Sequence, residues 1–156
     1  MKKAIKILFL CHGNICRSPG ALYIMKKLTA DAGLADRFFL DSAATTAEEI
    51  GNPVYPPMAR VLEAHGVPCG GHAARQMTRR DYEDFDLLIC MDRENLRDLD
   101  RFYHGDPEGK VHLLMEYAGR PGTQVSDPWW TRDFEEAYRD LLDGCRGLLE
   151  ALRPDL

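Results

Sequence analysis

Two cysteines and an arginine lie close together near the start of the chain, in the segment LFLCHGNICRSPG (residues 8–20). Cys11 and Cys16 have the spacing of half a zinc site, and they could also close a disulfide. With Arg17 they fit a third chemistry, in which loop N–H groups and a guanidinium bind an anion beneath a thiolate nucleophile. Three functions for this segment therefore compete.

A zinc site would need two more ligands, and Cys69 with His72 could nominally supply them. Both residues are distant in the sequence, and Arg17 would place a permanent cation beside the metal, so we expect no bound metal. The chain has five cysteines without a repeating framework, which is typical of free thiols in a reducing compartment. A permanent Cys11–Cys16 disulfide is therefore disfavoured, and a reversible one stays open.

The anion-binding interpretation uses every residue of the segment. Backbone N–H groups curled by Gly13 and leading into a helix N-terminus would form a nest of positive potential, to which Arg17 adds a planar fork of donors. The same field favours the thiolate form of Cys11. The predicted phosphate-binding residues are His12, Gly13, Asn14, Ile15, Cys16, Arg17 and Ser18.

Apolar segments that alternate with amphipathic ones must position this loop. Strands are expected at residues 4–10, 38–43, 86–91 and 111–115. Helices are expected from Ser18 to Gly33, at 58–65, after a Thr78–Asp81 capping box, after Asp92 as N-cap, and over 134–152. This alternation predicts one α/β domain over residues 1–156, with a four-stranded parallel sheet and helices on both faces. Ligands bind outside the carboxyl ends of such strands, where Cys11 stands.

Composition restricts the partners. At 156 residues and 45% hydrophobic content the chain can bury a core. A net charge of −5 argues against binding nucleic acid through a general basic field. No segment approaches the about 20 apolar residues of a membrane span, and Lys6 interrupts the first apolar run, which favours a strand over a secretory signal. We expect a cytoplasmic monomer without nucleic-acid or membrane partners.

Two motifs at opposite ends of the chain carry a family resemblance. CHGNICRSP (residues 11–19), directly after the first strand, resembles the signature of the low-molecular-weight protein tyrosine phosphatases, and SDPWW (126–130) resembles their general-acid loop. The resemblance covers about residues 6–152 and implies a flavodoxin-like phosphatase fold with strand order 2-1-3-4. Segments similar to family segments, in the expected order, are DSAAT, EIGNP, HGVP, HAARQ, DFDLLICMD and NLRDL.

The resemblance implies a reaction and its catalytic residues. Cys11 would attack phosphorus to form a cysteinyl-phosphate, while Arg17 and the loop amides hold the equatorial oxygens. Asp127 would protonate the leaving phenolate and then activate water. The implied substrates are phosphotyrosine proteins or small aryl phosphates, the product is inorganic phosphate, and no metal or cofactor is required.

Further residues match the family as supporting groups. Asn14, Ser18, Ser42 and His72 would form a network that holds the loop, with Asn14 in a strained backbone conformation. Ser18 could cap the following helix and also stabilise the thiolate. By resemblance Cys16 could trap an oxidised Cys11 as a disulfide; the alternative is a loop residue selected for size.

Five residues are expected around the substrate pocket. Trp129 and Trp130 stand where the family usually carries two tyrosines and would wall the pocket. Ile15 favours an aryl phosphate, because relatives resembling arginine phosphatases tend to have threonine here. His12 and Glu48 depart from the family pattern, and a carboxylate of Glu48 at the rim would repel acidic peptides and accept basic ones.

Three alternative functions stay open. An arsenate reductase of the same fold would need a close pair of extra cysteines after the third strand, where Cys90 has no partner. Cys90 and Cys145 are instead predicted to be core residues. A phosphoarginine phosphatase is disfavoured by Ile15, and a non-catalytic phosphate-binding module would lack the nucleophile or the acid, whereas this chain has both Cys11 and Asp127.

Overall fold

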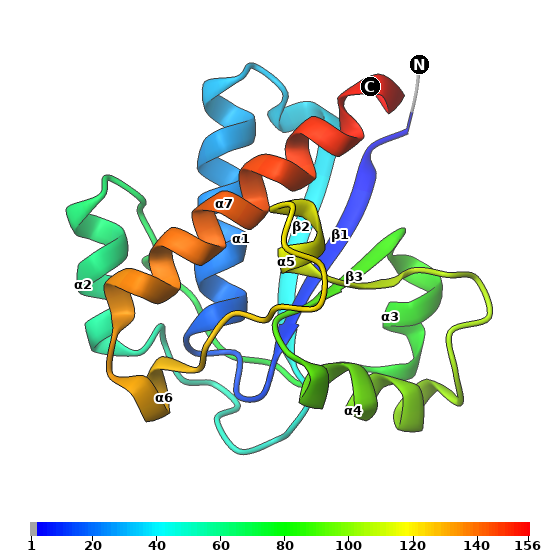
Figure 1. Cartoon of the computed structure of the whole chain (residues 1–156), viewed down its shortest axis with the longest axis horizontal. Coiled ribbons are helices and arrows are strands. Elements are labelled where there is room, and N and C mark those ends of the chain that lie inside the picture. Colours follow the sequence, from blue (N-terminus) through cyan, green and yellow to red (C-terminus); the bar gives the residue numbers. More distant parts are fainter. Residues whose placement is uncertain (1–2) are drawn as a thin grey trace.

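The computed structural model describes residues 3–156, and its centre is a single parallel sheet (Figure 1). The strands are β1 (Ile5–Cys11), β2 (Phe38–Ala44), β3 (Leu87–Cys90) and β4 (Val111–Leu113). They are hydrogen-bonded in the order β2-β1-β3-β4, and every pairing is parallel. The expected sheet and its strand order are thereby confirmed.

Helices cover both faces of the sheet. One face carries α1 (Arg17–Asp31), α2 (Pro56–Ala64), α5 (Leu114–Tyr117) and α7 (Phe134–Leu152), and the other carries α3 (Arg79–Asp84) and α4 (Arg93–Tyr103). A short helix, α6 (Pro128–Thr131), precedes α7, and two 3₁₀ turns, η1 (Ala35–Arg37) and η2 (Arg153–Asp155), complete the described elements.

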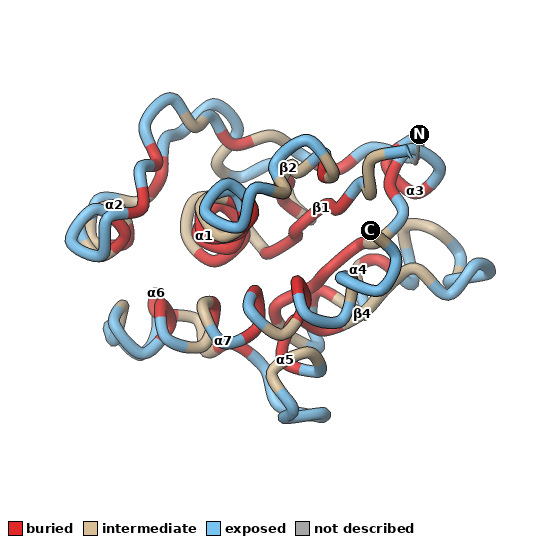
Figure 2. Tube along the Cα trace, turned by 90° about the horizontal axis from the view of Figure 1, so that it is seen from above, coloured by how far each residue is buried: buried red, intermediate tan, exposed pale blue. Residues whose placement is uncertain are grey.

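The central strand β1 supplies both halves of the core. Ile7 and Phe9 pack with α1 and α7, whereas Leu8 and Leu10 pack against the side of α3 and α4. All four side chains are fully buried, because successive residues of a strand point to opposite faces and both faces are covered. Figure 2 shows the buried backbone concentrated in β1 and on the sides of α1 and α7 that face the interior.

The predicted fourth strand is too long. It ends at Leu113, and the expected strand residues Leu114 and Met115 begin α5 instead. The reason lies in α7, where Gly144 and Gly147 let α5 approach closely. A Cβ at Gly144 would collide with the Leu114 side chain, and one at Gly147 would overlap the carbonyl of Tyr117. Packing between α5 and α7 therefore ends the strand early.

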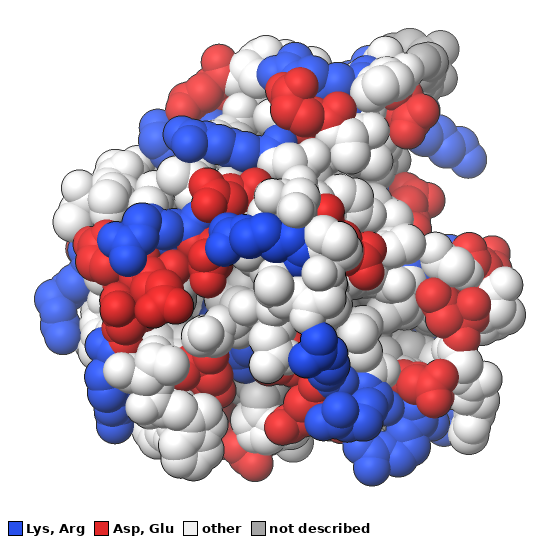
Figure 3. All heavy atoms as spheres, viewed as in Figure 1, with Lys and Arg blue, Asp and Glu red and all other residues white. Residues whose placement is uncertain are grey.

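Charged side chains of both signs are interspersed over the face of the molecule drawn in Figure 3. Among residues 3–156 no helix is both long and apolar enough to cross a membrane.

Candidate active site

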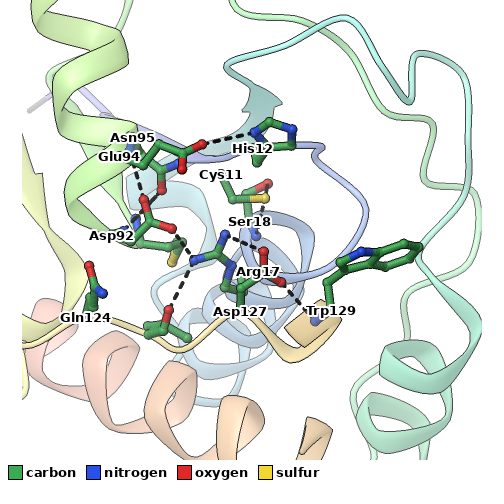
Figure 4. Close-up of polar contacts among 12 residues, drawn as sticks. Cys11, His12, Arg17, Ser18, Asp92, Glu94, Asn95, Gln124, Asp127 and Trp129 are labelled. Carbon is green, nitrogen blue, oxygen red and sulfur yellow. Dashed lines mark hydrogen bonds and ion pairs between the residues drawn. The ribbon is translucent and has the colours of Figure 1, made fainter. Parts of the chain in front are cut away.

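A cavity of about 790 Å³ opens at the loop between β1 and α1, at the carboxyl end of the sheet. Cys11, the last residue of β1, is 3% exposed and lines its floor. The cavity is enclosed by the loop after β1, the loop after β2, the start of α4 and the segment 124–131. Residues far apart in the sequence thus meet around one cysteine, as Figure 4 shows.

Ser18 lies against the Cys11 sulfur. Its Oγ is 3.0 Å from Cys11 Sγ, and its backbone N–H donates to the same sulfur over 3.4 Å. The Ser18 hydroxyl also accepts a hydrogen bond from Asn14 Nδ2 at 2.8 Å, which leaves its own hydrogen free to be donated to sulfur. The hydroxyl and the N–H of Ser18 are thus both directed at Sγ, where they would stabilise negative charge that develops during a reaction.

The predicted capping role of Ser18 is wrong. Helix α1 begins at Arg17, its N-cap is Cys16, and no side chain caps it. Ser18 lies within the first turn, where its hydroxyl is bonded to Asn14 and Cys11. The Ser18 N–H of this first turn is therefore free of a helical partner and is directed at Sγ.

Arg17 is buried beside Cys11 and held by acceptors on two sides. Its Nη1 donates to Asp92 Oδ2 at 2.6 Å and to the Val125 carbonyl at 3.1 Å, and its Nη2 lies 3.5 Å from Asp127 Oδ2. Burial alone lowers the pKa of Arg17, but the charges of Cys11, Asp92 and Asp127 outweigh it and raise the pKa above its ordinary value. The guanidinium therefore stays a cation with a fixed orientation.

Asp92 is a functional residue that sequence reasoning missed. It caps α4 as predicted, with Oδ1 accepting from the Asn95 N–H at 2.8 Å. Its second oxygen binds Arg17, which makes one carboxylate both a helix cap and a support for the guanidinium. The available signal was its position directly after the third strand, at the same edge of the sheet as Cys11.

Asn14 organises the loop from behind. It is fully buried and has a left-handed backbone with φ of 57°. Its Nδ2 donates to Ser18 and, at 2.9 Å, to Ser42 Oγ, and its Oδ1 accepts from the Arg75 N–H at 3.1 Å. His72 Nε2 lies 2.7 Å from the Asn14 carbonyl, so this nitrogen carries the proton. The structure brings the four predicted supporting residues into one network.

His72, one of the nominal zinc ligands, has its Nε2 bonded to the Asn14 carbonyl in the phosphate loop, residues 12–18. Burial, together with the charge on Cys11, raises the pKa of the Cys16 thiol well above its ordinary value, which keeps Cys16 protonated. Cys90 and Cys145 are fully buried in the core, as expected. The sulfur of Cys90, which was considered for the arsenate reductase alternative, is therefore not accessible from the cavity.

Asp127 lines the cavity and forms an ion pair with Arg17. It is the N-cap of α6, with Oδ1 accepting from the Trp129 N–H at 3.0 Å, and its side chain is 29% exposed. Sequence reasoning did not predict α6, and it therefore missed this cap. The bond from Trp129 fixes the carboxylate so that its other oxygen, Oδ2, faces the Arg17 guanidinium (Figure 4).

Aromatic side chains form one wall of the cavity. Trp129 is 48% exposed, with its ring centroid 5.6 Å from that of Tyr55 and 5.3 Å from the Arg132 guanidinium. Trp130 also lines the cavity but is 80% exposed. Tyr55 and Phe134 line the same wall and were not predicted, although the PVYPP loop carried an aromatic residue beside prolines.

The remaining predicted pocket residues also line the cavity. Ile15 lies near its apolar wall, and His12 and Glu48 stand at its mouth. His12 Nε2 is 2.9 Å from Glu48 Oε2. The cavity thus combines a buried sulfur, a fixed guanidinium, a partly exposed carboxyl and an aromatic wall, which together define a site for thiolate attack on a phosphate ester.

Comparison with known proteins identifies the family. The low molecular weight phosphotyrosine protein phosphatase family matches residues 6–156, and the chain belongs to it. The phosphatase of that name from Pongo abelii is 40% identical over 148 residues, which is 92% of this chain and 93% of the relative.

Two solved structures extend the comparison. The crystal structure of YfkJ from Bacillus subtilis has a TM-score of 0.94 at 34% identity, covering 99% of this chain and 98% of that one. The crystal structure of DARP, the Drosophila arginine phosphatase, has a TM-score of 0.88 at 31% identity, covering 97% of this chain and all of that one.

Proposed function

We propose that the chain hydrolyses phosphotyrosine and other aryl phosphate monoesters through a cysteinyl-phosphate intermediate. The observation that carries this proposal is a buried Cys11 sulfur that faces two donors of Ser18, with Arg17 lining the same cavity and the Asp127 carboxyl 3.5 Å from the Arg17 guanidinium. Membership of the phosphatase family supports it.

The first step transfers the phosphoryl group to sulfur. Cys11 Sγ attacks phosphorus in line with the aryl oxygen, and the bond between phosphorus and that oxygen breaks. Asp127 donates its proton to the departing phenolate, which becomes a neutral phenol. The Arg17 fork and the loop N–H groups bind the three equatorial oxygens, where charge spreads in the transition state.

The second step releases phosphate. Asp127, now a carboxylate, takes a proton from water, whose oxygen attacks phosphorus on the face opposite the sulfur. The sulfur–phosphorus bond breaks, which returns the Cys11 thiolate and liberates inorganic phosphate. The two steps use only these protein groups and one water molecule, which returns to Asp127 the proton given to the phenol, and the proposal includes no cofactor.

The shape of the cavity favours an aryl ester. The nucleophile lies at the floor, and the walls formed by Trp129, Tyr55 and Ile15 can stack on or enclose a phenyl ring. A phosphoserine side chain is shorter and has no ring to contact this wall. In this proposal the whole chain acts as one catalytic domain, as a cytoplasmic monomer, on substrates that are neither nucleic acid nor membrane.

The experiment compares phosphate release from p-nitrophenyl phosphate and from a phosphotyrosine peptide by the protein and by Cys11→Ser. We expect turnover of both by the protein, a phosphocysteine trapped by rapid acid quenching, and no turnover by Cys11→Ser. Cys69→Ser makes the same atom exchange outside the cavity and should keep its activity. Full activity in Cys11→Ser would overturn the mechanism.

Phosphoarginine hydrolysis is a second candidate, because the Drosophila arginine phosphatase shares the fold at 31% identity. The apolar Ile15 in the cavity favours a phenyl ring over a charged guanidino group. A phosphoarginine peptide and a phosphotyrosine peptide of otherwise identical sequence distinguish the two activities. A higher kcat/KM for phosphoarginine would transfer the assignment to that substrate.

A further inference from the structure

His12 lies between two carboxylates at the mouth of the cavity. Its Nε2 is 2.9 Å from Oε2 of Glu48, in the loop after β2, and its Nδ1 is 3.3 Å from Oε1 of Glu94, in the first turn of α4. Figure 4 shows the imidazole pointing toward Glu94. We name these three residues the charged bridge, because they join the loop after β2 to α4 beside the phosphate loop.

The charged bridge is accessible and remains negative in both states of His12. The side chains of His12, Glu48 and Glu94 are 40%, 63% and 59% exposed. Two carboxylates and one imidazolium sum to −1, and two carboxylates with a neutral imidazole sum to −2. Each carboxylate has two oxygens and can accept further hydrogen bonds beside the one that faces His12.

Other charges around the mouth only partly offset the bridge. Arg17 is buried and paired with Asp92, and the Arg93 guanidinium donates to the Gly122 carbonyl. Arg97 is exposed and lies about one helical turn from Glu94 along α4. Besides the two bridge partners, the charged groups that line the cavity with His12 are Cys11, Arg17, Glu49, Asp92, Arg93, Arg97 and Asp127.

We propose that the charged bridge is a cation-binding subsite that selects phosphotyrosine substrates with a lysine or arginine beside the phosphotyrosine. This inference rests on the proposed phosphatase function. When the phosphate lies over Cys11, the substrate chain must leave through the mouth that His12, Glu48 and Glu94 line. A flanking ammonium or guanidinium is attracted there by two carboxylates, whereas a flanking carboxylate is repelled.

The preference should strengthen as the pH rises. Burial alone lowers the pKa of His12, but the hydrogen bonds and charges of Glu48 and Glu94 outweigh it, and the pKa is raised above 6.5. Below this pKa the bridge carries −1, and as pH rises through it the imidazole loses its proton and the bridge reaches −2. Lysine and glutamate side chains of a peptide keep their charges between about pH 6 and 8.5.

The test uses acetylated and amidated phosphotyrosine peptides with lysine, alanine or glutamate on either side, and p-nitrophenyl phosphate as a substrate without flanks. We expect the ratio of kcat/KM for lysine over glutamate peptides to be about fivefold at low salt on at least one side, and to shrink at high salt. It should be larger at pH 8 than at pH 6. Absence of p-nitrophenyl phosphate turnover would contradict the proposed function, and turnover with equal peptide rates would overturn this inference alone.

Variants locate the effect, and each ratio is taken within one variant so that a general loss of activity cancels. The double variant Glu48→Gln/Glu94→Gln should bring the ratio close to one. His12→Gln keeps both carboxylates and should keep the preference but lose its dependence on pH. Arg97→Gln should increase the ratio. A preference that survives the double variant, or an unchanged pH dependence in His12→Gln, would overturn the assignment.

A matched control makes the same charge change far from the cavity. Glu150 lies on α7, sixteen residues beyond the cavity residue Phe134, which is about 24 Å along the helix. Its partner Arg153 is exposed, so the ion pair contributes little to stability. Glu150→Gln should leave the peptide ratio unchanged, and an altered ratio would attribute the preference to net charge and contradict a local subsite.

Discussion

Asn14 in the phosphate loop is fully buried and makes three side-chain hydrogen bonds, whereas Trp130 at the rim of the same cavity is 80% exposed. The loop is held by groups behind it, including Ser42 and the backbone of Arg75, none of which lines the cavity. The rim is built from side chains that point into solvent. One region therefore has its geometry fixed before substrate arrives, and the other has freedom to accommodate it.

This difference separates two tasks. Stabilising a transition state requires donors that do not reorganise when charge develops, which a buried and fully bonded loop provides. Selecting among substrates requires only differences in affinity, and exposed charges and rings supply these at small energies. Changes in the loop should reduce kcat, and changes at the rim should alter KM or selectivity.

The largest effect is expected from Arg17→Lys. The ammonium of lysine keeps the charge but cannot bind two phosphate oxygens at once. It also cannot contact Asp92 and Asp127 through two separate nitrogens, as Arg17 does, so kcat should fall about 10²- to 10³-fold. Steady-state kinetics with p-nitrophenyl phosphate measures it. Arg101→Lys, on the exposed surface of α4, is the matched control and should keep kcat. A kcat within twofold of the parent would show that the fork is dispensable.

Asp127→Asn should reveal the proton donor. Asparagine also caps a helix, so α6 should stay formed while the proton is lost. We expect kcat to fall about 10²-fold with phenyl phosphate and much less with p-nitrophenyl phosphate, whose leaving group needs no proton.

The control for this substitution is Asp133→Asn, the same exchange at the N-cap of α7. It should leave both rates unchanged. Equal losses with phenyl phosphate and p-nitrophenyl phosphate in Asp127→Asn would contradict a role as general acid and would favour a purely electrostatic one.

Two substitutions of Asn14 test how the loop is supported. Asn14→Gly keeps the left-handed backbone but removes the hydrogen bonds to Ser18, Ser42 and Arg75, so the free energy of unfolding should fall by about 2 kcal/mol. Asn14→Ala should lose about 1 kcal/mol more, because alanine resists a positive φ. Urea unfolding measures both. An alanine variant as stable as the glycine variant would show that φ is not constrained.

The phosphate loop could be predicted from the sequence because its parts are local. Cys11 and Arg17 are six residues apart, and one turn between a strand and a helix is enough to bring the sulfur and the guanidinium together. The parallel sheet was predictable for a similar reason, since buried apolar strands that alternate with amphipathic helices have few ways to pack.

What escaped prediction depends on long-range packing. The cap formed by Asp92 is local and was predicted, but its bond to Arg17 exists only because β3 pairs with β1. The hydrophobicity of Leu114 and Met115 is compatible with a strand or a helix. They form the helix α5 because Gly144 lets α5 pack closely against α7. The segment SDPWW indicated an acid and two aromatic residues, but not the cap at α6.

The smallest effects should come from the aromatic wall. Trp129 packs against Tyr55 and below Arg132, so its ring is already in place for a substrate ring, and Trp129→Ala should raise KM for p-nitrophenyl phosphate about fivefold. Trp130 is far more exposed, and Trp130→Ala should raise KM less than about twofold. Trp129→Phe retains a ring and should recover part of the loss. Neither alanine variant should lower kcat much, because the phosphate loop is untouched. A fall in kcat approaching that of Arg17→Lys would mean that the aromatic wall and the phosphate loop act as one unit.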